Sequence, residues 1–313
     1  MSSPHDDYLF FQEEHYKVHG VLGKGGAGIV YKVSNQSGRF YACKVLNYEL
    51  MEDQGQMSAF SKEAQIGINM AHEHLVSVHR KLLIHGDKDG HPERRYPAIL
   101  MDFVDGVDMH HLKKVYETKM QRPFPTNHAI LLLAKACSGL EMLHYHQIRH
   151  GDLKPKNILV SKTGYPKITD YGISTFIGEP TSAKGITGTL RYLAPEQLTH
   201  LKGRKAVIDQ RTDIYALGIV ALEMTAGLPR ELYGPFADVA RFILGGNRQL
   251  LAYVSESDLP KDLQFVIRSC LDQRMEKRPR VIRDLHNVLL QTIYGKSKGI
   301  TLENVGDLIK QIL

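Results

Sequence analysis

The feature that most limits how this chain can fold is a change of hydrophobic pattern near residues 102–108. Between Tyr16 and Val45, short apolar runs rich in β-forming residues alternate with glycines, which is typical of antiparallel strands. After Gly106, apolar residues recur three and four positions apart, which is typical of helices. The sequence therefore predicts an α+β fold of two lobes, a small β-rich lobe with one main helix and a larger, mainly helical lobe.

The expected elements follow from these two periodicities. Strands are expected over 16–22, 29–33, 40–45, 76–84 and 97–103, with a helix over 58–70. Helices are expected over 127–147, 211–226, 239–244, 263–271 and 281–290, with a final amphipathic helix within 299–313. The expected division is an N-terminal extension over 1–15, a first lobe with its hinge over 16–104, a second lobe over 105–295 and a C-terminal helical extension over 296–313. Nucleotide sites favour junctions between lobes.

The segment from His150 to Asn157, followed by Asp170, carries the residue types that phosphoryl transfer from a metal-bound nucleotide needs. Asp152 supplies a carboxylate that accepts a hydroxyl proton, and Lys154 supplies a cation for the transferring phosphoryl group. Asn157 and Asp170 supply oxygen ligands of the kind that magnesium prefers. Their order and spacing predict a phosphotransferase.

A glycine-rich loop lies earlier in the chain, between two predicted strands. It contains Gly23, Gly25 and Gly28, followed by Val30, and its missing side chains let backbone N–H groups approach phosphate oxygens. A dinucleotide-binding loop has similar glycines but opens a helix. The β-type residues on both sides therefore argue against a dinucleotide site.

Lys44 and Glu63 are a second candidate pair. Lys44, on the next predicted strand, is placed to bind the α- and β-phosphates, and Glu63 of the predicted helix is placed to hold it. Taken in isolation, such a pair is more often a solvated strand lysine and an exposed helix carboxylate.

Composition limits the partners and the compartment. The 40 Lys and Arg residues against 34 Asp and Glu residues give a net charge of +6, but the basic residues are dispersed, so no nucleic-acid partner is expected. The three cysteines lie far apart and suggest neither a disulfide framework nor a zinc site, so a reducing, cytoplasmic location is expected. No leader segment and no membrane anchor are expected.

With all these motifs in order, the chain resembles the eukaryotic-type, or Hanks-type, protein kinase superfamily across roughly residues 16–295. The run from Ala194 to Gln197 is similar to that of bacterial eukaryote-like serine/threonine kinases. The matching motifs are Gly23-x-Gly25-x-x-Gly28-x-Val30, Ala42-x-Lys44, Glu63, His150-x-Asp152-x-Lys154-x-x-Asn157, Asp170-Tyr171-Gly172, Gly188-Thr189, Ala194-Pro195-Glu196, Asp213-Ile214-Tyr215-Ala216-Leu217-Gly218 and Arg278.

The resemblance implies ATP and Mg²⁺ (or Mn²⁺) as cofactors, and it assigns roles residue by residue. The implied catalytic and metal-binding set is Asp152 as base, Lys154 at the γ-phosphate, Asn157 and Asp170 as metal ligands, Glu63 positioning Lys44, and Thr189 in contact with Asp152 and Lys154. The implied adenine and ribose set is Met101 as gatekeeper, Asp102 to Val104 as hinge, Asp108 at the ribose, and Val30, Ala42 and Leu159 around the ring.

Two structural roles are also implied by the resemblance. Asp213 is expected to brace the catalytic loop from within the second lobe, and Glu196 is expected to pair with Arg278. Removing one partner of such a buried pair would cost about 3–5 kcal/mol.

The chain departs from the family pattern at Gly151, where the family usually has arginine, and at Thr175, where a basic residue often stands. A receptor for an activation-loop phosphate is therefore missing, and activity is expected not to require phosphorylation of Thr175, Thr181, Ser182 or Thr187. A second departure pairs Tyr171, which replaces the usual phenylalanine, with Gly67 in place of a bulky apolar residue. Two interpretations stay open: the Tyr171 ring fills the space beside Gly67, or Met70 or Ile66 fills it.

Lys154 and the Gly188-Thr189 segment resemble kinases that phosphorylate serine or threonine, so a protein substrate with a Ser/Thr acceptor is expected. Gly151 leaves an alternative open, because His-Gly-Asp also resembles small-molecule kinases of the aminoglycoside and choline type. These enzymes generally lack the Ala194-Pro195-Glu196 segment and the Asp213 to Gly218 motif. A pseudokinase scaffold that binds ATP without turnover is a further alternative. The sequence leaves the oligomeric state open.

Overall fold

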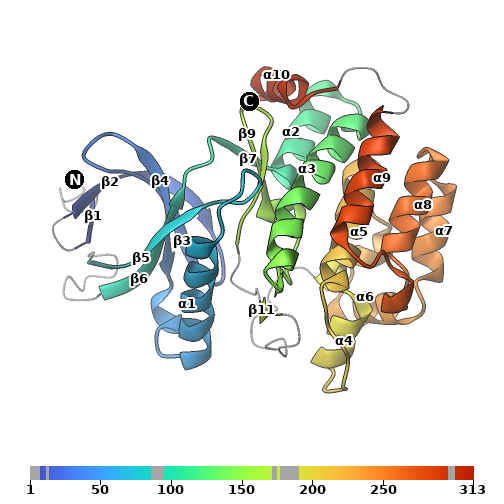
Figure 1. Cartoon of the computed structure of the whole chain (residues 1–313), viewed down its shortest axis with the longest axis horizontal. Helices are drawn as coiled ribbons and strands as arrows, with labels where there is room; N and C mark the ends of the chain where they lie inside the picture. The colour runs from blue at the N-terminus through green and yellow to red at the C-terminus, as the bar shows by residue number, and fades with distance from the viewer. Residues whose placement is uncertain (1–7, 12–13, 86–94, 171–174, 177–189, 295–299) are drawn as a thin grey trace. The chain divides into compact units, whose positions relative to one another are not determined.

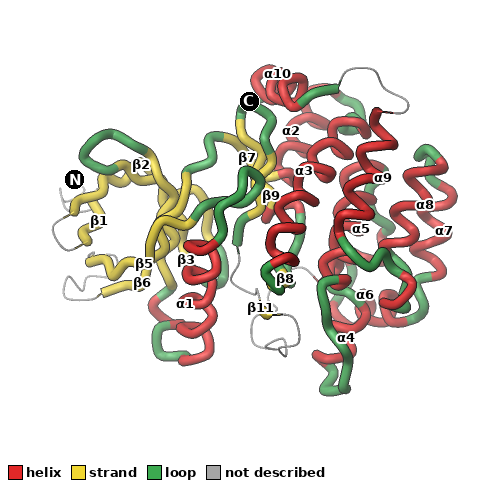
Figure 2. Tube along the Cα trace, viewed as in Figure 1, coloured by secondary structure: helices red, strands yellow, loops and turns green. Residues whose placement is uncertain are grey.

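The computed structural model describes residues 8–11, 14–85, 95–170, 175–176, 190–294 and 300–313. The chain divides into two units, Met1–Val104 (unit 1) and Asp105–Leu313 (unit 2), and each is described by itself. Strands dominate unit 1 and helices dominate unit 2, which confirms the predicted α+β class (Figure 2).

Unit 1 is a closed antiparallel barrel in the order β1-β2-β3-β4-β6-β5. Its strands are β1 (Tyr8–Phe11), β2 (Glu14–Lys24), β3 (Gly28–Ser34), β4 (Phe40–Leu46), β5 (Val78–His85) and β6 (Arg95–Asp102). The sequence predicted a sheet without β1, because four residues are too few to show an alternating pattern. β1 closes the barrel, since Phe10 pairs with His15 of β2 and with His85 of β5.

Side chains of β4 alternate between the barrel core and the opposite face of the strand, which carries the candidate site residues Ala42 and Lys44. Cys43 and Val45 belong to the apolar cluster inside the barrel. Successive side chains of a strand point to opposite faces, so Ala42 and Lys44 point away from that cluster. Both are nonetheless buried, which shows that the outer face of β4 is also covered.

Helix α1 (Gln54–Asn69) lies against the barrel within unit 1 (Figure 1). Its N-cap is Asp53, whose carboxylate accepts hydrogen bonds from the backbone N–H groups of Gly55 and Gln56. The helix therefore begins four residues before the predicted start at residue 58. Its buried positions include Phe60, Glu63, Ala64, Ile66 and Gly67.

Unit 2 combines the helices with short strands. The helices are α2 (Met109–Met120), α3 (Thr126–Tyr145), α4 (Pro195–Leu201), α5 (Arg211–Thr225), α6 (Phe236–Leu244), α7 (Arg248–Glu256), α8 (Lys261–Cys270), α9 (Ile282–Tyr294) and α10 (Leu302–Ile312). The strands form two small sheets, β7 (Gly106–Asp108) with β9 (Ile158–Ser161) and β10 (Pro166–Ile168), and β8 (Ile148–Arg149) with β11 (Thr175–Phe176).

The core of unit 2 is built on α3 and α5. Every residue from Thr212 to Met224 of α5 is buried, as expected for a helix enclosed on all sides. α9 packs on α3, and α8 packs on α5. The predictions for these four helices and for α6 are confirmed within a few residues at each end.

The sequence prediction missed α2, α4 and α7. α2 buries Met109, Leu112 and Tyr116, which recur at helical spacing, but its remaining residues are largely polar. α4 has seven residues, which is too few turns for a clear period, and α7 buries only Leu250 and Val254 of its nine residues. The tertiary contacts of these helices, rather than their own pattern, fix them.

The predicted final helix is α10, which packs on α2 and α3 of unit 2. Val305, Ile309 and Ile312 are fully buried, and Thr301 and Asn304 form a capping box at its start. None of the helices in the described part of the chain is both long enough and apolar enough to pass through a bilayer.

Candidate active site

In unit 1, the structure brings Lys44 and Glu63 together. Lys44 Nζ lies 2.7 Å from Glu63 Oε1 and 2.9 Å from Oε2, and the two side chains are 9% and 5% exposed. The interpretation of this pair as a solvated lysine and an exposed carboxylate is therefore wrong. A buried ammonium held by both carboxylate oxygens has a fixed position, as a phosphate ligand requires.

The glycine-rich loop connects β2 to β3, and hydrogen bonds from the segment that follows β4 hold it in place. Asn47 donates its backbone N–H to the Ala27 carbonyl (3.1 Å) and its side-chain Nδ2 to the Gly26 carbonyl (3.1 Å). Gly28 lies so close to β4 that a Cβ there would be 2.1 Å from the Val45 carbonyl oxygen. Only glycine fits at this position, so the close approach of the two backbones explains Gly28.

The predicted adenine-binding residues of unit 1 lie on neighbouring strands. Ala42 pairs with Met101 across β4 and β6, and Val30 pairs with Lys44 across β3 and β4. At the end of β6, the Asp102 carboxylate lies 2.8 Å from His79 Nε2 and 3.8 Å from the Arg39 guanidinium. Val104 is the last residue of unit 1.

The two predicted nucleotide residues of unit 2 are paired partners. Asp108 of β7 lies opposite Leu159 of β9. The Asp108 carboxylate is also the N-cap of α2, because its Oδ1 accepts the backbone N–H of His111 at 2.9 Å. The helix start therefore fixes the position of this side chain.

The segment around Asp152 brings three predicted residues of unit 2 into direct contact. Lys154 Nζ lies 2.5 Å from Asp152 Oδ2, and Asn157 Nδ2 lies 3.2 Å from the same oxygen and 2.8 Å from the Asp152 carbonyl oxygen. Both side-chain contacts use Oδ2, so Oδ1 of Asp152 accepts no hydrogen bond from any described residue. The described neighbours of Asp152 therefore position one of its carboxylate oxygens and leave the other without a described donor.

Asn157 also suits a cation. Its amide nitrogen donates to Asp152 twice, which orients the carboxamide and leaves Oδ1 as the oxygen for a ligand. Carboxamide and carboxylate oxygens are ligands that Mg²⁺ accepts, with phosphate and water completing the shell. Asn157 and Asp170 therefore fit a magnesium ion by donor chemistry.

Asp170 is tied to this segment through its neighbour Thr169. The Thr169 N–H donates to the Asn157 carbonyl at 3.0 Å, and the Thr169 carbonyl lies 3.0 Å from His150 Nε2. Asp170 itself has a φ of 71°, in the left-handed region that non-glycine residues seldom occupy. Such backbone strain is common at functional sites. Tyr171, Gly172, Gly188 and Thr189 lie outside the described residues.

Asp213 of α5 holds the backbone before Asp152. Its Oδ2 accepts the His150 N–H at 2.9 Å, its Oδ1 accepts the Gly151 N–H at 2.8 Å, and His144 Nε2 lies 2.9 Å from Oδ2. Burial alone would raise the pKa of Asp213, but the hydrogen bonds and the nearby histidines outweigh it and lower the pKa below its ordinary value. The expected bracing contact is therefore present.

Gly151 has a φ of 80°, which favours glycine. Its carbonyl accepts a hydrogen bond from Gln197 Nε2 at 3.1 Å, and Gln197 Oε1 accepts the Ala194 N–H at 2.9 Å. One glutamine thus links the start of α4 to the segment beside Asp152. Gln197 was not among the residues predicted from the sequence, although its position two residues after Pro195 is that of a helix-capping glutamine.

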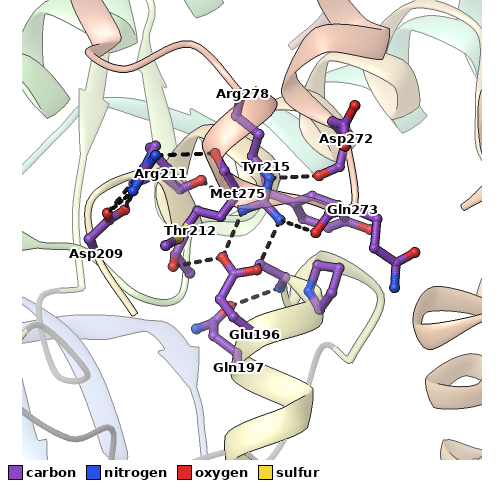
Figure 3. Close-up of polar contacts among 12 residues, drawn as sticks. Glu196, Gln197, Asp209, Arg211, Thr212, Tyr215, Asp272, Gln273, Met275 and Arg278 are labelled. Carbon is purple, nitrogen blue, oxygen red and sulfur yellow. Dashed lines mark hydrogen bonds and ion pairs between the residues drawn. The ribbon is translucent and has the colours of Figure 1, made fainter. Parts of the chain in front are cut away.

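The Glu196–Arg278 pair joins α4 to the chain before α9 (Figure 3). Arg278 Nη1 lies 2.7 Å from Glu196 Oε1, and Nη2 lies 2.9 Å from Oε2. Arg278 Nε donates to the Asp272 carbonyl, Thr212 donates to Glu196, and the guanidinium lies 4.9 Å from the centre of the Tyr215 ring. The Arg278 side chain is fully buried. The two residues therefore pair as expected.

Comparison with known proteins places these features in a wider context. A family model described as "Protein kinase domain" matches residues 16–290. The chain is 33% identical over 299 residues to serine/threonine-protein kinase PknB of Mycobacterium tuberculosis (strain H37Rv), covering 90% of this chain and 44% of that protein. It is 33% identical over 221 residues to PknB of Mycolicibacterium smegmatis, covering 69% of this chain and 33% of that protein.

A third similar protein is the probable serine/threonine-protein kinase PknB of Lactococcus lactis, which is 31% identical over 218 residues, covering 68% of this chain and 32% of that protein. The matches therefore span between 32% and 44% of the length of these curated relatives.

Proposed function

Because the chain belongs to the protein kinase domain family, we propose that it transfers the γ-phosphate of ATP to serine or threonine hydroxyls of protein substrates. The observation that carries this proposal is the arrangement around Asp152, in which Lys154 and Asn157 both contact Oδ2. The similarity to proteins named serine/threonine kinases supports the choice of acceptor.

In this proposal, Oδ1 of Asp152 accepts the proton of the substrate hydroxyl as the hydroxyl oxygen attacks the γ-phosphorus. Lys154 holds the opposite carboxylate oxygen and carries the positive charge that the transferring phosphoryl group needs. Asn157 and Asp170 hold Mg²⁺, which when bound supplies charge neutralisation for the phosphates. The family resemblance assigns Thr189, which lies outside the described residues, a contact with Asp152 and Lys154 in this proposal.

The residues of unit 1 bind the nucleotide. Lys44, fixed by Glu63, binds the α- and β-phosphates, and the backbone N–H groups of the loop from Gly23 to Gly28 bind phosphate oxygens. The proposed adenine contacts are Val30, Ala42, Met101, Asp102 and Val104 of unit 1, and the proposal adds two residues of unit 2, Leu159 at the adenine and Asp108 at the ribose. The lobes comprise 16–104 and 105–295, flanked by 1–15 and 296–313.

We also propose that activity does not depend on activation-loop phosphorylation. Gly151 has no guanidinium to bind a phosphate on the activation loop. The nearby Arg149 is fully buried, so its guanidinium does not serve as a phosphate receptor at the surface. Phosphatase treatment of the active enzyme should leave turnover unchanged. A loss of turnover that rephosphorylation restored would refute this part of the proposal.

We propose a reducing, cytoplasmic compartment, and the free, buried thiols of Cys43, Cys137 and Cys270 support this proposal. Burial raises the pKa of the Cys43 thiol to about 12, which makes it unreactive at neutral pH.

The first experiment is transfer of radiolabelled phosphate from Mg-ATP by the wild type and by Asp152→Asn. The acceptors are a generic Ser/Thr protein and a panel of aminoglycosides and choline. Label on protein serine or threonine that disappears in the variant is expected. Transfer to small molecules alone would identify a small-molecule kinase, and a melting-temperature shift with Mg-ATP without transfer would identify a pseudokinase. Phosphotyrosine alone would contradict the Ser/Thr assignment.

A further inference from the structure

The loop that follows α4 in unit 2 has a fixed backbone. The N–H groups of Lys202, Gly203 and Arg204 donate to the carbonyls of Leu198, His200 and Thr199, at 3.2, 2.9 and 3.2 Å, respectively. These bonds satisfy the last carbonyl groups of the helix. The chain then runs without helix or strand to α5 (Figure 2).

A surface pocket of about 610 Å³ lies on this loop. It is lined by His200, Gly203, Arg204, Lys205, Ala206 and Val207. The Val207 side chain is 74% exposed, whereas the next residue, Ile208, is buried. The exposed aliphatic side chain of Val207 offers an apolar contact, and the cationic residues beside it give the pocket a positively charged rim. This combination suits a ligand that is both apolar and anionic.

The charge of the loop is unbalanced. Lys202, Arg204 and Lys205 are exposed, and no Asp or Glu lies between Gln197 and Ile208. None of the three cations forms an ion pair with a described residue. The chain has a surplus of six basic residues (40 minus 34), so these three residues equal half of it. The first carboxylate after the loop, Asp209, is already held by Arg211 at 2.6 Å.

Helix capping does not account for these cations. Basic side chains are stabilising near a helix C-terminus, but α4 has only seven residues and its last carbonyls are already bonded by backbone N–H groups. The three side chains are therefore not needed to end the helix. They remain available to bind an anionic partner.

The loop lies near the proposed phosphate-transfer residues within unit 2. Gln197, near the start of α4, is bonded to the Gly151 carbonyl, next to Asp152. A helix rises about 1.5 Å per residue, so the loop after α4 lies on the order of 10 Å from Gln197. An extended peptide spans about 3.3 Å per residue, so roughly three to five residues cover this distance.

We propose that this loop, residues 202–207, docks an acidic segment of the protein substrate that carries one apolar anchor residue. The anchor contacts Val207 and Ala206 in the pocket, and the acidic residues pair with Arg204, Lys205 and Lys202. The acidic segment lies roughly three to five residues from the phosphorylated serine or threonine. This inference rests on the proposed protein kinase function and names its substrate class.

The test uses synthetic threonine peptides and the full chain. One set carries Glu-Glu-Leu-Glu four residues before or after the threonine, and matched sets carry Gln-Gln-Leu-Gln or Glu-Glu-Ser-Glu. The enzymes are the wild type, a loop variant with Arg204→Glu and Lys205→Glu, and a control with Arg248→Glu and Lys261→Glu. The control changes the charge equally at two exposed residues of α7 and α8. Both kcat/KM and peptide binding by fluorescence anisotropy are measured.

The wild type should prefer an acidic peptide by about tenfold in kcat/KM, the order that a few exposed ion pairs and one apolar contact supply. The loop variant should lose both the preference in kcat/KM and the peptide binding, whereas the control variant should keep both. For the wild type, both should be reduced with the Glu-Glu-Ser-Glu peptide, which lacks the apolar anchor, and both should be weakened by salt. Equal use of acidic and neutral peptides, or a preference that survives in the loop variant, would overturn the inference.

Binding and transfer separate this inference from the proposed function. Loop-dependent binding of the acidic peptide without transfer to any protein or peptide would support the docking site and refute the kinase activity. Phosphate transfer to protein or peptide without a preference for the acidic peptide would support the kinase activity and refute the docking site. An oligonucleotide of equal charge that displaced the acidic peptide as well as the peptide itself would overturn the inference in favour of a nucleic-acid surface.

Discussion

Replacing Arg278 by methionine tests the buried network that joins α4 to α5 and to the chain before α9. Arg278 has a fully buried side chain that bonds both carboxylate oxygens of Glu196 and the carbonyls of Asp272 and Arg211. Methionine has a similar length but no donor. In the variant, the Glu196 carboxylate keeps the hydroxyl of Thr212 as its one remaining partner among the described residues.

The magnitude follows from that geometry. Glu196 is 9% exposed and cannot recover its hydration, so losing the guanidinium should cost about 3–5 kcal/mol of the free energy of unfolding. For a chain of this size, each kcal/mol corresponds to about 2–4 °C, so the melting temperature should fall by roughly 6–20 °C. Replacing Glu196 by leucine as well removes the uncompensated charge and should recover part of the loss.

Thermal unfolding followed by circular dichroism measures this loss. Arg274→Met is the matched control, because Arg274 is 65% exposed and lies 3.6 Å from Asp272, so its removal should cost less than about 1 kcal/mol. If Arg278→Met lowered the melting temperature no more than Arg274→Met, the buried-charge argument would be refuted. If the double variant with Arg278→Met and Glu196→Leu were less stable than Arg278→Met alone, the expected recovery of stability would be contradicted.

Three further predictions concern other parts of the fold. Asp213→Asn should cost about 3 kcal/mol of the free energy of unfolding at neutral pH. Because the pKa of Asp213 is lowered in the folded protein, its stabilising contribution is present above the unfolded pKa near 3.9 and is lost as pH falls through the folded pKa. The melting temperatures of the wild type and the variant should therefore converge in acid, and a difference independent of pH would contradict this. Gly151→Arg, at a φ of 80°, should cost about 1–2 kcal/mol of the free energy of unfolding, whereas Gly234→Arg, at a φ of −78°, should cost little. If the two variants had equal melting temperatures, backbone strain at residue 151 would be refuted. Gly67→Leu should lower kinase activity by filling the space proposed for the Tyr171 ring, and unchanged activity and stability would favour the interpretation in which neighbouring side chains of α1 fill it.

Much of the fold was predictable because it depends on local periodicity. α3 and α5 carry long apolar patterns, and five of the six barrel strands are runs rich in apolar, β-forming residues, so their existence follows from the sequence. β1 has four residues and α4 has seven, and such short elements have no readable period. Each is fixed by pairing or packing with distant parts of the chain.

For the candidate site, the sequence determined which chemical groups are present and in what order. The spacing of Asp152, Lys154 and Asn157 places them in one short loop, where sequence neighbours necessarily lie close together. Their direct contacts therefore follow from local structure.

The family resemblance named Glu63 as the partner of Lys44 and Asp213 as the brace of that loop, but only the tertiary structure showed the contacts by which these distant residues act. Glu63 is one of many carboxylates until α1 packs on β5 and places it against Lys44, in an environment that excludes water. Asp213 reaches the backbone of His150 across more than sixty residues of chain because α5 is enclosed by unit 2. The physical reason is that burial makes a charged group select its partner, and burial is a property of the packed core rather than of any short stretch of sequence.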